Sequence, residues 1–374
     1  MYSRTIENII KKRIHKGKAI VVIGARQVGK TTLIKKILNN KDYLFLDADD
    51  PAVRNLLFNP TTEQLRSLIG DNRLIFLDEA QRIESIGITL KIITDQFKTA
   101  QLFVSGSSSF DLGNRLNEPL TGRKREYELF PISWEEFENT EGFLQSEQQL
   151  ENRLLYGFYP EVLNNTGEEK QVLKELVSSY LYKDILSYSN IRKPEVLEKL
   201  VEALALQIGN EVNYNELGQT VGINKNTIQN YINILEKGYI VFRLRSYSSN
   251  VRSEIKRSRK IYFWDNGIRN MIIGNFNTLN LRQDKGALWE NFLVSERYKQ
   301  NIYKETFAKM YFWRTKQKQE VDFVEVKDGK IFGYEFKWQA KKKIKLPKTF
   351  TDAYDAESQV IDKTNFREFV TIKS

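Results

Sequence analysis

The chain of 374 residues contains no cysteine and a single histidine, His15. Without cysteine it can form neither disulfide bonds nor thiolate metal sites. With one histidine, the chain can form neither a catalytic pair of serine or cysteine with histidine nor a histidine-rich metal site, unless His15 itself takes part. His15 lies in the basic segment 11–16, so we assign it no role. Chemistry in this protein must therefore depend on carboxylates, lysine and hard metal ions such as Mg²⁺ or Mn²⁺.

Long apolar runs are also missing from the sequence. No segment approaches the run of about 20 apolar residues that spans a membrane, and the N-terminus lacks the apolar core of a signal peptide. We therefore expect a cytoplasmic protein without membrane contact. The chain is too long for one ordinary hydrophobic core, so more than one domain is expected.

The whole chain has a formal charge of +10, and the positive charge is concentrated in its C-terminal part. Residues 1–160 hold 22 Lys and Arg against 21 Asp and Glu, whereas residues 161–374 hold 36 against 27. This asymmetry favours a polyanionic partner, and DNA rather than RNA is the nucleic acid that we expect. A basic surface that serves only solubility is the alternative.

A phosphate-binding loop occupies residues 24–31, which read Gly-Ala-Arg-Gln-Val-Gly-Lys-Thr. It follows an apolar run and precedes a helical pattern, which is the context that this motif requires. The glycines let backbone N–H groups point at an anion, and the start of the helix adds positive field. Lys30 is expected to contact the β- and γ-phosphates of ATP, and Thr31 to bind Mg²⁺. The residues expected to line the nucleotide are Gly24, Ala25, Arg26, Gln27, Val28, Gly29, Lys30, Thr31 and Thr32.

Two acidic residues, Asp78 and Glu79, follow the apolar run 74–77. Asp78, at the end of a buried parallel strand, is expected to hold Mg²⁺ through water. Glu79 is expected to polarise the attacking water, which indicates hydrolysis rather than binding alone. Ser105, at the end of a third strand, is a candidate sensor of the γ-phosphate, or it simply opens a turn. Arg123 is a candidate arginine finger, in cis or towards a neighbouring copy, and a solvated arginine is the alternative.

These motifs resemble a bacterial and archaeal family of AAA-type ATPases. The resemblance also rests on Phe-Pro-Ile-Ser-Trp-Glu-Glu-Phe at 130–137, on 157–161 and on 180–185, and it covers essentially the whole chain. It implies an ATPase module, then a winged-helix segment and a C-terminal region of uncertain role.

Residues 195–247 predict helices over 195–207, 214–221 and 224–236, followed by a strand over 239–244. Gly222 would end the second helix, and Asn224 would cap the third. This order and these lengths predict a winged helix-turn-helix. Polar residues at the exposed start of the last helix could contact bases or phosphates; they are Lys225, Asn226, Thr227, Gln229 and Asn230.

Basic residues follow on the predicted wing and are expected to contact phosphates. They are Arg243, Arg245, Arg252, Lys256, Arg257, Arg259 and Lys260. Winged helices also bind proteins, so a protein partner is the open alternative for this segment.

The C-terminal part predicts a helix over 287–300 and strands over 310–314, 320–326 and 330–338. Asp328-Gly329 is a strong signal for a two-residue hairpin turn. Such a turn places Asp322 opposite Glu335 on one face of the hairpin. Two facing carboxylates repel each other, and a metal ion between them would resolve the conflict.

Four residues of this region resemble the PD-(D/E)xK nuclease superfamily: Glu290, Asp322, Glu335 and Lys337. The resemblance implies that the acids bind Mg²⁺ and that Lys337 orients water or stabilises the phosphate in cleavage. Glu320, expected opposite Lys337, departs from the pattern and could hold that lysine in a salt bridge. A solvated hairpin face with alternating charges is the alternative, as is a nuclease fold that no longer cuts.

We therefore predict an α/β protein of three modules: a P-loop ATPase with a parallel sheet over 1–160, a helical and winged-helix segment over 161–265, and a restriction-endonuclease-like domain over 266–374. The leading hypothesis is an Mg²⁺-dependent ATPase that couples ATP hydrolysis to the handling of nucleic acid. A nucleotide-state switch that binds protein partners and an ATP-gated nuclease are the alternatives. ATP and Mg²⁺ are the expected cofactors, with a second Mg²⁺ or Mn²⁺ in the C-terminal domain. A homo-oligomer is compatible with an arginine finger acting between copies.

Overall fold

The computed structural model describes all residues except 107–118, 180–190, 192, 249–258, 340–344 and 372–374. The chain divides into two compact units, residues 1–131 with 237–239, and residues 132–236 with 240–374. The segment 180–185 and the wing residues Arg252, Lys256 and Arg257 lie outside the described residues. None of the helices in the described part of the chain combines the length and apolar character that crossing a membrane requires.

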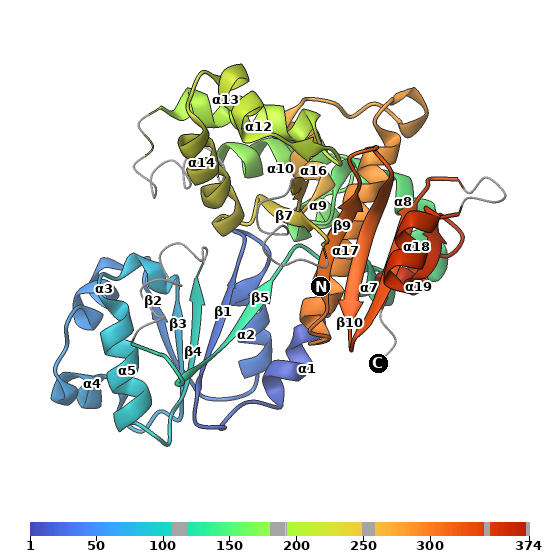
Figure 1. Ribbon diagram of the computed structural model, residues 1–374. Coiled ribbons are helices and arrows are strands. Elements are labelled where there is room, and N and C mark those ends of the chain that lie inside the picture. The colour runs from blue at the N-terminus through green and yellow to red at the C-terminus, as the bar shows by residue number, and fades with distance from the viewer. Residues whose placement is uncertain (107–118, 180–190, 192, 249–258, 340–344, 372–374) are drawn as a thin grey trace. The chain divides into compact units, whose positions relative to one another are not determined.

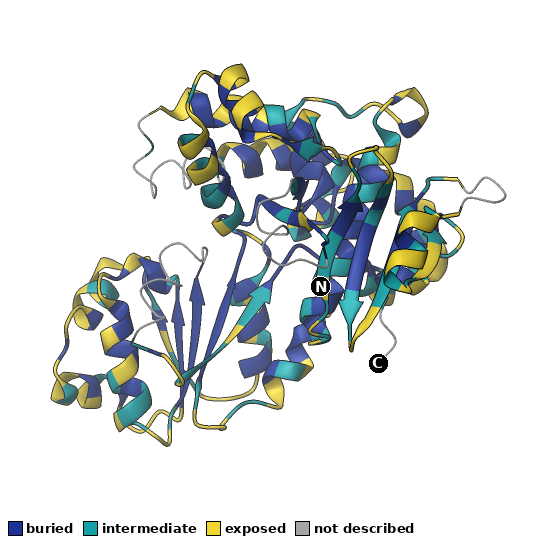
Figure 2. Cartoon of the chain, viewed as in Figure 1, coloured by how far each residue is buried: buried dark blue, intermediate teal, exposed yellow. Residues whose placement is uncertain are grey.

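The first unit contains a five-stranded sheet in the order β2-β3-β4-β1-β5 (Figure 1). Its strands are β1 (Ala19–Gly24), β2 (Leu44–Asp47), β3 (Leu74–Asp78), β4 (Gln101–Gly106) and β5 (Lys124–Leu129). All neighbouring strands are parallel, which confirms the predicted parallel sheet. The strands β1, β3 and β4 are buried along their whole length (Figure 2), as expected for a parallel sheet covered on both faces.

Helices surround this sheet: α1 (Thr5–Lys11), α2 (Lys30–Leu38), α3 (Pro51–Leu57), α4 (Thr62–Ile69) and α5 (Ile86–Gln96). Leu57, Leu65 and Leu90 bring α3, α4 and α5 into one core with alternate residues of the strands. The helix α2 packs against β1 and β4. Because α2 begins directly after the phosphate-binding loop, this packing holds the loop at the C-terminal edge of the sheet.

The second unit contains a seven-stranded mixed sheet in the order β12-β11-β10-β9-β7-β8-β6. Its strands are β6 (Glu211–Val212), β7 (Val241–Ser246), β8 (Arg259–Phe263), β9 (Lys309–Arg314), β10 (Glu320–Lys327), β11 (Lys330–Phe336) and β12 (Glu357–Ile361). The pairs β7–β9 and β11–β12 are parallel, and the other neighbours are antiparallel. Strands from both sides of the expected boundary at 265 and 266 therefore share one sheet.

The helices of the second unit include all those expected from the sequence pattern. They are α7 (Trp134–Glu141), α8 (Phe143–Tyr156), α9 (Pro160–Asn164), α10 (Glu169–Leu176), α12 (Pro194–Leu206), α13 (Tyr214–Val221), α14 (Lys225–Lys237), α16 (Asn266–Ile272), α17 (Lys285–Tyr303), α18 (Lys348–Tyr354) and α19 (Phe366–Val370). Gly222 ends α13 in a left-handed conformation, and Asn224 accepts the Thr227 backbone N–H at 2.9 Å at the start of α14.

The hairpin β10–β11 has the predicted register. Asp328 and Gly329 both have positive φ, of 51° and 77°, as a tight two-residue turn of this kind requires. The pairing Lys327↔Lys330 continues to Phe323↔Tyr334, and the next step outward sets Asp322 opposite Glu335.

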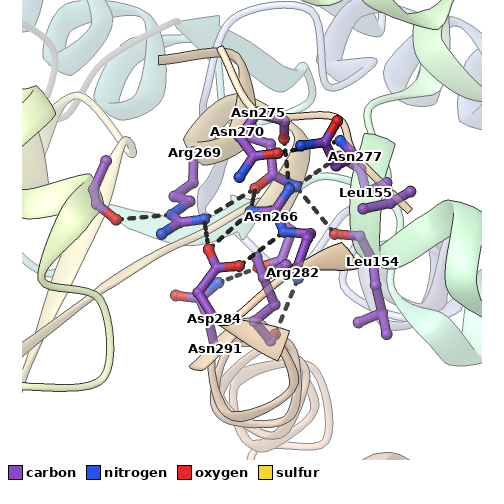
Figure 3. Close-up of polar contacts among 12 residues, drawn as sticks. Leu154, Leu155, Asn266, Arg269, Asn270, Asn275, Asn277, Arg282, Asp284 and Asn291 are labelled. Carbon is purple, nitrogen blue, oxygen red and sulfur yellow. Dashed lines mark hydrogen bonds and ion pairs between the residues drawn. The ribbon is translucent and has the colours of Figure 1, made fainter. Parts of the chain in front are cut away.

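A buried polar network holds α16 and the start of α17 in place (Figure 3). Arg282 donates to both carboxylate oxygens of Asp284 at 2.8 Å, and Arg269 donates to Asp284 at 2.5 Å. Asn270 anchors the same network to α8 by donating to the Leu155 carbonyl at 2.8 Å. Burial raises the pKa of Asp284, but the hydrogen bonds and charges of Arg282 and Arg269 outweigh this effect and hold the pKa at about 2. One carboxylate thus pairs with two guanidinium groups whose side chains are almost completely buried.

Candidate functional site

The phosphate-binding loop leaves the C-terminal end of β1 at Gly24 and enters α2 at Lys30. A Cβ atom at Gly24 would lie 2.0 Å from the Leu129 carbonyl oxygen, so no other residue fits there. Gly29 precedes α2 with a φ of +94°, which turns the backbone into the helix. Both glycines are therefore needed for the loop to curl over the end of the sheet.

Lys30 lies beneath the loop rather than in solvent. Its Nζ donates to the carbonyl oxygens of Gly24 at 3.2 Å and Ala25 at 2.7 Å. Burial lowers the pKa of Lys30 to about 8, against the opposite pull of Glu79 and Asp78. The ammonium group is thus held close to the backbone that would surround a phosphate.

Asp78 lies at the centre of a group of oxygen atoms. Thr31 Oγ1 donates to Asp78 Oδ2 at 2.8 Å, and the Ser105 hydroxyl also donates to Asp78. The strand β4 lies between β1 and β3 in the sheet, so Ser105 stands between the loop and Asp78. The Thr31 hydroxyl and the Asp78 carboxylate, 2.8 Å apart, are hard oxygen ligands of the kind that suit Mg²⁺. Mg²⁺ binds few protein groups and completes its shell with water or substrate phosphates.

Glu79 follows Asp78 in a left-handed backbone conformation, with a φ of +51°. Its backbone N–H donates to Asp78 Oδ1 at 3.2 Å, and its side chain accepts a hydrogen bond from Gln81 Nε2. Gln81 is itself buried and was not singled out by the sequence pattern. It holds the Glu79 carboxylate in one orientation, which a group acting on a water molecule requires.

Arg4 is a second residue that the sequence pattern did not single out. Its guanidinium is buried and donates to the Val28 carbonyl at 2.8 Å and to the Phe130 carbonyl at 2.6 Å. It therefore ties the loop to the end of β5. Of the other loop residues, Val28 is buried, Arg26 is half-buried, and Gln27 and Thr32 are exposed.

Arg123 lies at the N-terminal end of the parallel strands, whereas the loop lies at their C-terminal end. Its carbonyl oxygen accepts a hydrogen bond from the backbone N–H of Ala19, the first residue of β1. The loop begins at Gly24, the last residue of β1. Its guanidinium donates to Asp95 at 2.7 Å beside a cavity of about 290 Å³. Arg123 cannot reach the loop of its own chain, and its role towards a neighbouring copy stays a prediction.

The acidic residues of the C-terminal hairpin form a cluster with Glu290 of α17, and the metal site expected there stays a prediction. Among the described residues, no three acidic or histidine side chains are arranged to hold a metal ion. Lys260 Nζ lies 2.9 Å from Glu290 Oε1 and 2.5 Å from Glu320 Oε1. Burial raises the pKa of Asp322, and burial and then the neighbouring Asp322 carboxyl raise the pKa of Glu335.

Two expectations about lysines in this region are wrong. Lys260, expected on an exposed wing, is 1% exposed and lies inside the acidic cluster. Its ammonium group is buried and paired with Glu290 and Glu320, so it cannot contact a nucleic acid phosphate. Lys337, expected beside Glu320, instead donates to Glu335 on its own strand at 2.6 Å.

The helix α14 presents the polar face that its sequence predicted. Ile228, Ile232 and Leu235 are buried, and the side chains on the other face at its start are exposed or half-buried. The exposed ones are Lys225, Asn226, Gln229 and Asn230. Arg245 on β7 is also exposed, whereas Arg243 is paired with Glu236.

Comparison with known protein families divides the chain into three matched segments. Residues 16–138 match an AAA domain, and residues 147–279 and 285–370 match two domains of unknown function, DUF8612 and DUF4143. The chain is 26% identical over 335 residues to the uncharacterized protein Rv2008c of Mycobacterium tuberculosis, covering 88% of this chain and 72% of that protein. It is 22% identical over 345 residues to the uncharacterized protein MJ1544 of Methanocaldococcus jannaschii, covering 86% and 75%.

Among solved structures, the Walker-type ATPase PABY2304 of Pyrococcus abyssi is similar at 16% identity and a TM-score of 0.50. The similarity covers 73% of this chain and 96% of that chain, and at this identity it shows the fold alone. The AAA match over residues 16–138 and this likeness of fold agree with the parallel sheet and the phosphate-binding loop of the first unit.

Proposed function

We propose that this protein is an Mg²⁺-dependent ATPase that couples ATP hydrolysis to the binding of nucleic acid. The observation that carries the ATPase part is the convergence of Thr31 and Ser105 on Asp78, with Glu79 directly beside it. A passive nucleotide binder needs the loop and a metal ligand. It does not need an oriented carboxylate next to them, and that carboxylate is what favours hydrolysis.

Each residue of this site has one proposed task. The loop amides and Lys30 bind the phosphates and keep their negative charge close to the start of α2. Thr31 and Asp78 would hold Mg²⁺, which neutralises charge that develops on the phosphates. Glu79 takes a proton from the attacking water, and Ser105 orients Asp78 and the region of the γ-phosphate.

Nucleic-acid binding is assigned to the segment from α12 to β8. Its elements follow the order helix, strand, helix, helix, strand, strand, and β6 and β7 both pair antiparallel with β8. A Cβ atom at Gly218 of α13 would lie 2.5 Å from the Ile223 carbonyl, so α13 and the turn before α14 pack closely. This order and pairing support a winged helix whose recognition helix is α14, with DNA as the expected ligand.

A nucleotide-state switch that binds protein partners is the second candidate. It shares the ATP site and replaces DNA by a protein surface as the ligand of α14. The small uncharged side chains beside Lys225 on this face, Asn226, Gln229 and Asn230, favour base edges and phosphates over an apolar protein interface.

Steady-state ATP hydrolysis by the full chain in Mg²⁺, with and without duplex DNA, tests the proposal. We expect measurable turnover that duplex DNA increases. Absence of turnover in both conditions would exclude the ATPase. Turnover that DNA leaves unchanged, together with no DNA binding at low salt, would favour the protein switch.

Binding to duplex DNA should weaken steeply as salt rises, because the side chains that neutralise phosphates release counterions. Lys225→Ala combined with Arg245→Ala should reduce the slope of log Kd against log salt by about one for each phosphate that is no longer neutralised. Fluorescence anisotropy of labelled duplex at several salt concentrations measures this slope.

The matched control is Lys330→Ala, which removes one positive charge from an exposed hairpin turn of the same unit. It should leave the slope unchanged. The control removes one charge and the double variant removes two, so a reduction about half as large in the control would mean that DNA senses only net charge and that α14 is not the binding helix.

A further inference from the structure

The acidic cluster of the second sheet brings four carboxylates together. Glu290 comes from α17, Glu320 and Asp322 from β10, and Glu335 from β11. Such a group of partly buried carboxylates needs compensating positive charge or hydrogen-bond donors. The resemblance to PD-(D/E)xK nucleases implies that a divalent cation supplies this positive charge. The donors that contact each carboxylate in the structure bear on whether such a cation is needed.

Each of the four carboxylates already accepts from a donor of this chain. Glu290 accepts from Lys260 Nζ at 2.9 Å and from Tyr262 Oη at 2.6 Å. Glu320 pairs with Lys260 at 2.5 Å and with Arg314 at 3.6 Å.

The two carboxylates that face each other across the hairpin are satisfied in the same way. Asp322 accepts the backbone N–H of Phe336 at 2.8 Å. Glu335 accepts from Lys337 Nζ at 2.6 Å. Lys260, Lys337 and Arg314 thus supply three positive charges near these four carboxylates, and Arg314 also pairs with Glu211 at 3.3 Å. Each of the four carboxylates has a donor from this chain and does not depend on a divalent ion for a partner.

We propose that the ammonium group of Lys260 is a built-in cation that takes the place of a divalent metal ion in this cluster. Lys260 comes from β8, is 1% exposed, and bridges a helix carboxylate and a strand carboxylate that lie far apart in the sequence. While it is present, the cluster binds neither Mg²⁺ nor Mn²⁺.

A metal ion and Lys260 exclude each other for an energetic reason. An ion that took Glu290 and Glu320 as ligands would have to displace the ammonium group. Lys260 would then be a buried charge that has lost both of these partners, beside the Phe312 ring. Without a metal ion, the cluster has no means of metal-assisted phosphodiester cleavage.

The test uses the full chain in the absence of nucleotide and removes the ammonium group by Lys260→Ala. In metal-free buffer this variant should melt at a lower temperature than the wild type, because it leaves carboxylates uncompensated. Mn²⁺ at about 100 times its Kd should then raise its Tm by roughly 5 to 10 °C. The wild type should show no such rise, and titration followed by the electron paramagnetic resonance of free Mn²⁺ should show one more bound ion in the variant than in the wild type.

Lys299→Ala is the matched control. Lys299 is equally buried in the same unit, but it is paired with the single carboxylate of Glu296, at 2.7 Å. Its loss should also lower the Tm, and Mn²⁺ should not restore it, because one carboxylate does not make a metal site. If Lys260→Ala does not fold, Lys260→Gln retains a hydrogen-bond donor, is expected to fold, and carries the same Mn²⁺ test.

Two results would overturn the proposal. One is Mn²⁺ binding by the wild type that Asp322→Asn abolishes, which would mean that a metal site coexists with Lys260. The other is a folded Lys260 variant that does not respond to Mn²⁺, which would mean that the carboxylates cannot act together as ligands. The acidic cluster lies within the second unit, so the Mn²⁺ response of the Lys260 variants does not depend on ATP hydrolysis.

Discussion

Replacement of Glu79 by glutamine is expected to slow ATP hydrolysis by about two to four powers of ten while ATP binding persists. The amide keeps the shape of the side chain and can still contact Gln81, but it cannot accept a proton from water. We assign phosphate binding to the loop and Lys30, whose backbone contacts this change leaves in place, although it removes the Glu79 charge that raises the pKa of Lys30. Single-turnover hydrolysis, with binding measured by a fluorescent ATP analogue, separates the two effects.

Lys30→Ala is the companion variant, and it should fail at the other step. It removes the ammonium group beneath the loop, so ATP binding and turnover should be lost together. Hydrolysis by Glu79→Gln at the wild-type rate would show that another group activates the water. Retained ATP binding by Lys30→Ala would place the phosphates elsewhere.

Asp284→Asn is expected to destabilise the second unit by about 3 to 5 kcal/mol, because it leaves two buried guanidinium groups without a counter-charge. Arg269 and Arg282 both donate to this carboxylate, and their side chains are at most 1% exposed. For a unit of this size, the loss corresponds to a fall in Tm of roughly 10 °C or more. Thermal unfolding followed by circular dichroism measures it.

Glu357→Gln is the control for this prediction, because it breaks an exposed pair with Lys330 in the same unit. Exposed pairs contribute about 1 kcal/mol or less, so the control should melt close to the wild type. Equal losses in the two variants would mean that the Arg269 and Arg282 charges find other partners.

The same carboxylate predicts a dependence on pH. Its pKa of about 2 in the folded chain is lower than the ordinary value of about 3.9. A lowered carboxyl pKa stabilises the folded state above the unfolded pKa, and this contribution is lost as the pH falls towards the folded pKa. The difference in stability between wild type and Asp284→Asn should therefore shrink between about pH 4 and pH 2.

Features that depend on neighbouring residues in the chain could be predicted from the sequence. The strand, loop and helix around residues 24–31 follow from a local change from an apolar run to glycines and then to a helical period. The register of β10 and β11 follows from the Asp328-Gly329 turn, since a two-residue turn leaves one pairing. The helices α12, α13 and α14 follow from apolar spacing with local end signals at Gly222 and Asn224.

Partners that meet across elements could not be predicted in this way. Lys260 lies 30 residues from Glu290 and 60 from Glu320, and nothing in its local sequence separates it from the basic residues around it. Only the order of strands in the mixed sheet, with β8 three places from β10, brings the Lys260 side chain to the acidic cluster.

Residue types and their spacing alone therefore determined that this chain has a phosphate-binding loop, an acidic pair after a buried strand and an acidic hairpin. The tertiary structure decided which charges meet. It brought Arg4 to the loop, took Arg123 to the far edge of the sheet and set Lys260 among carboxylates where a metal ion was expected. The physical reason is that local patterns depend on backbone geometry within a few residues, whereas charge pairing depends on burial and strand order, which long-range packing sets.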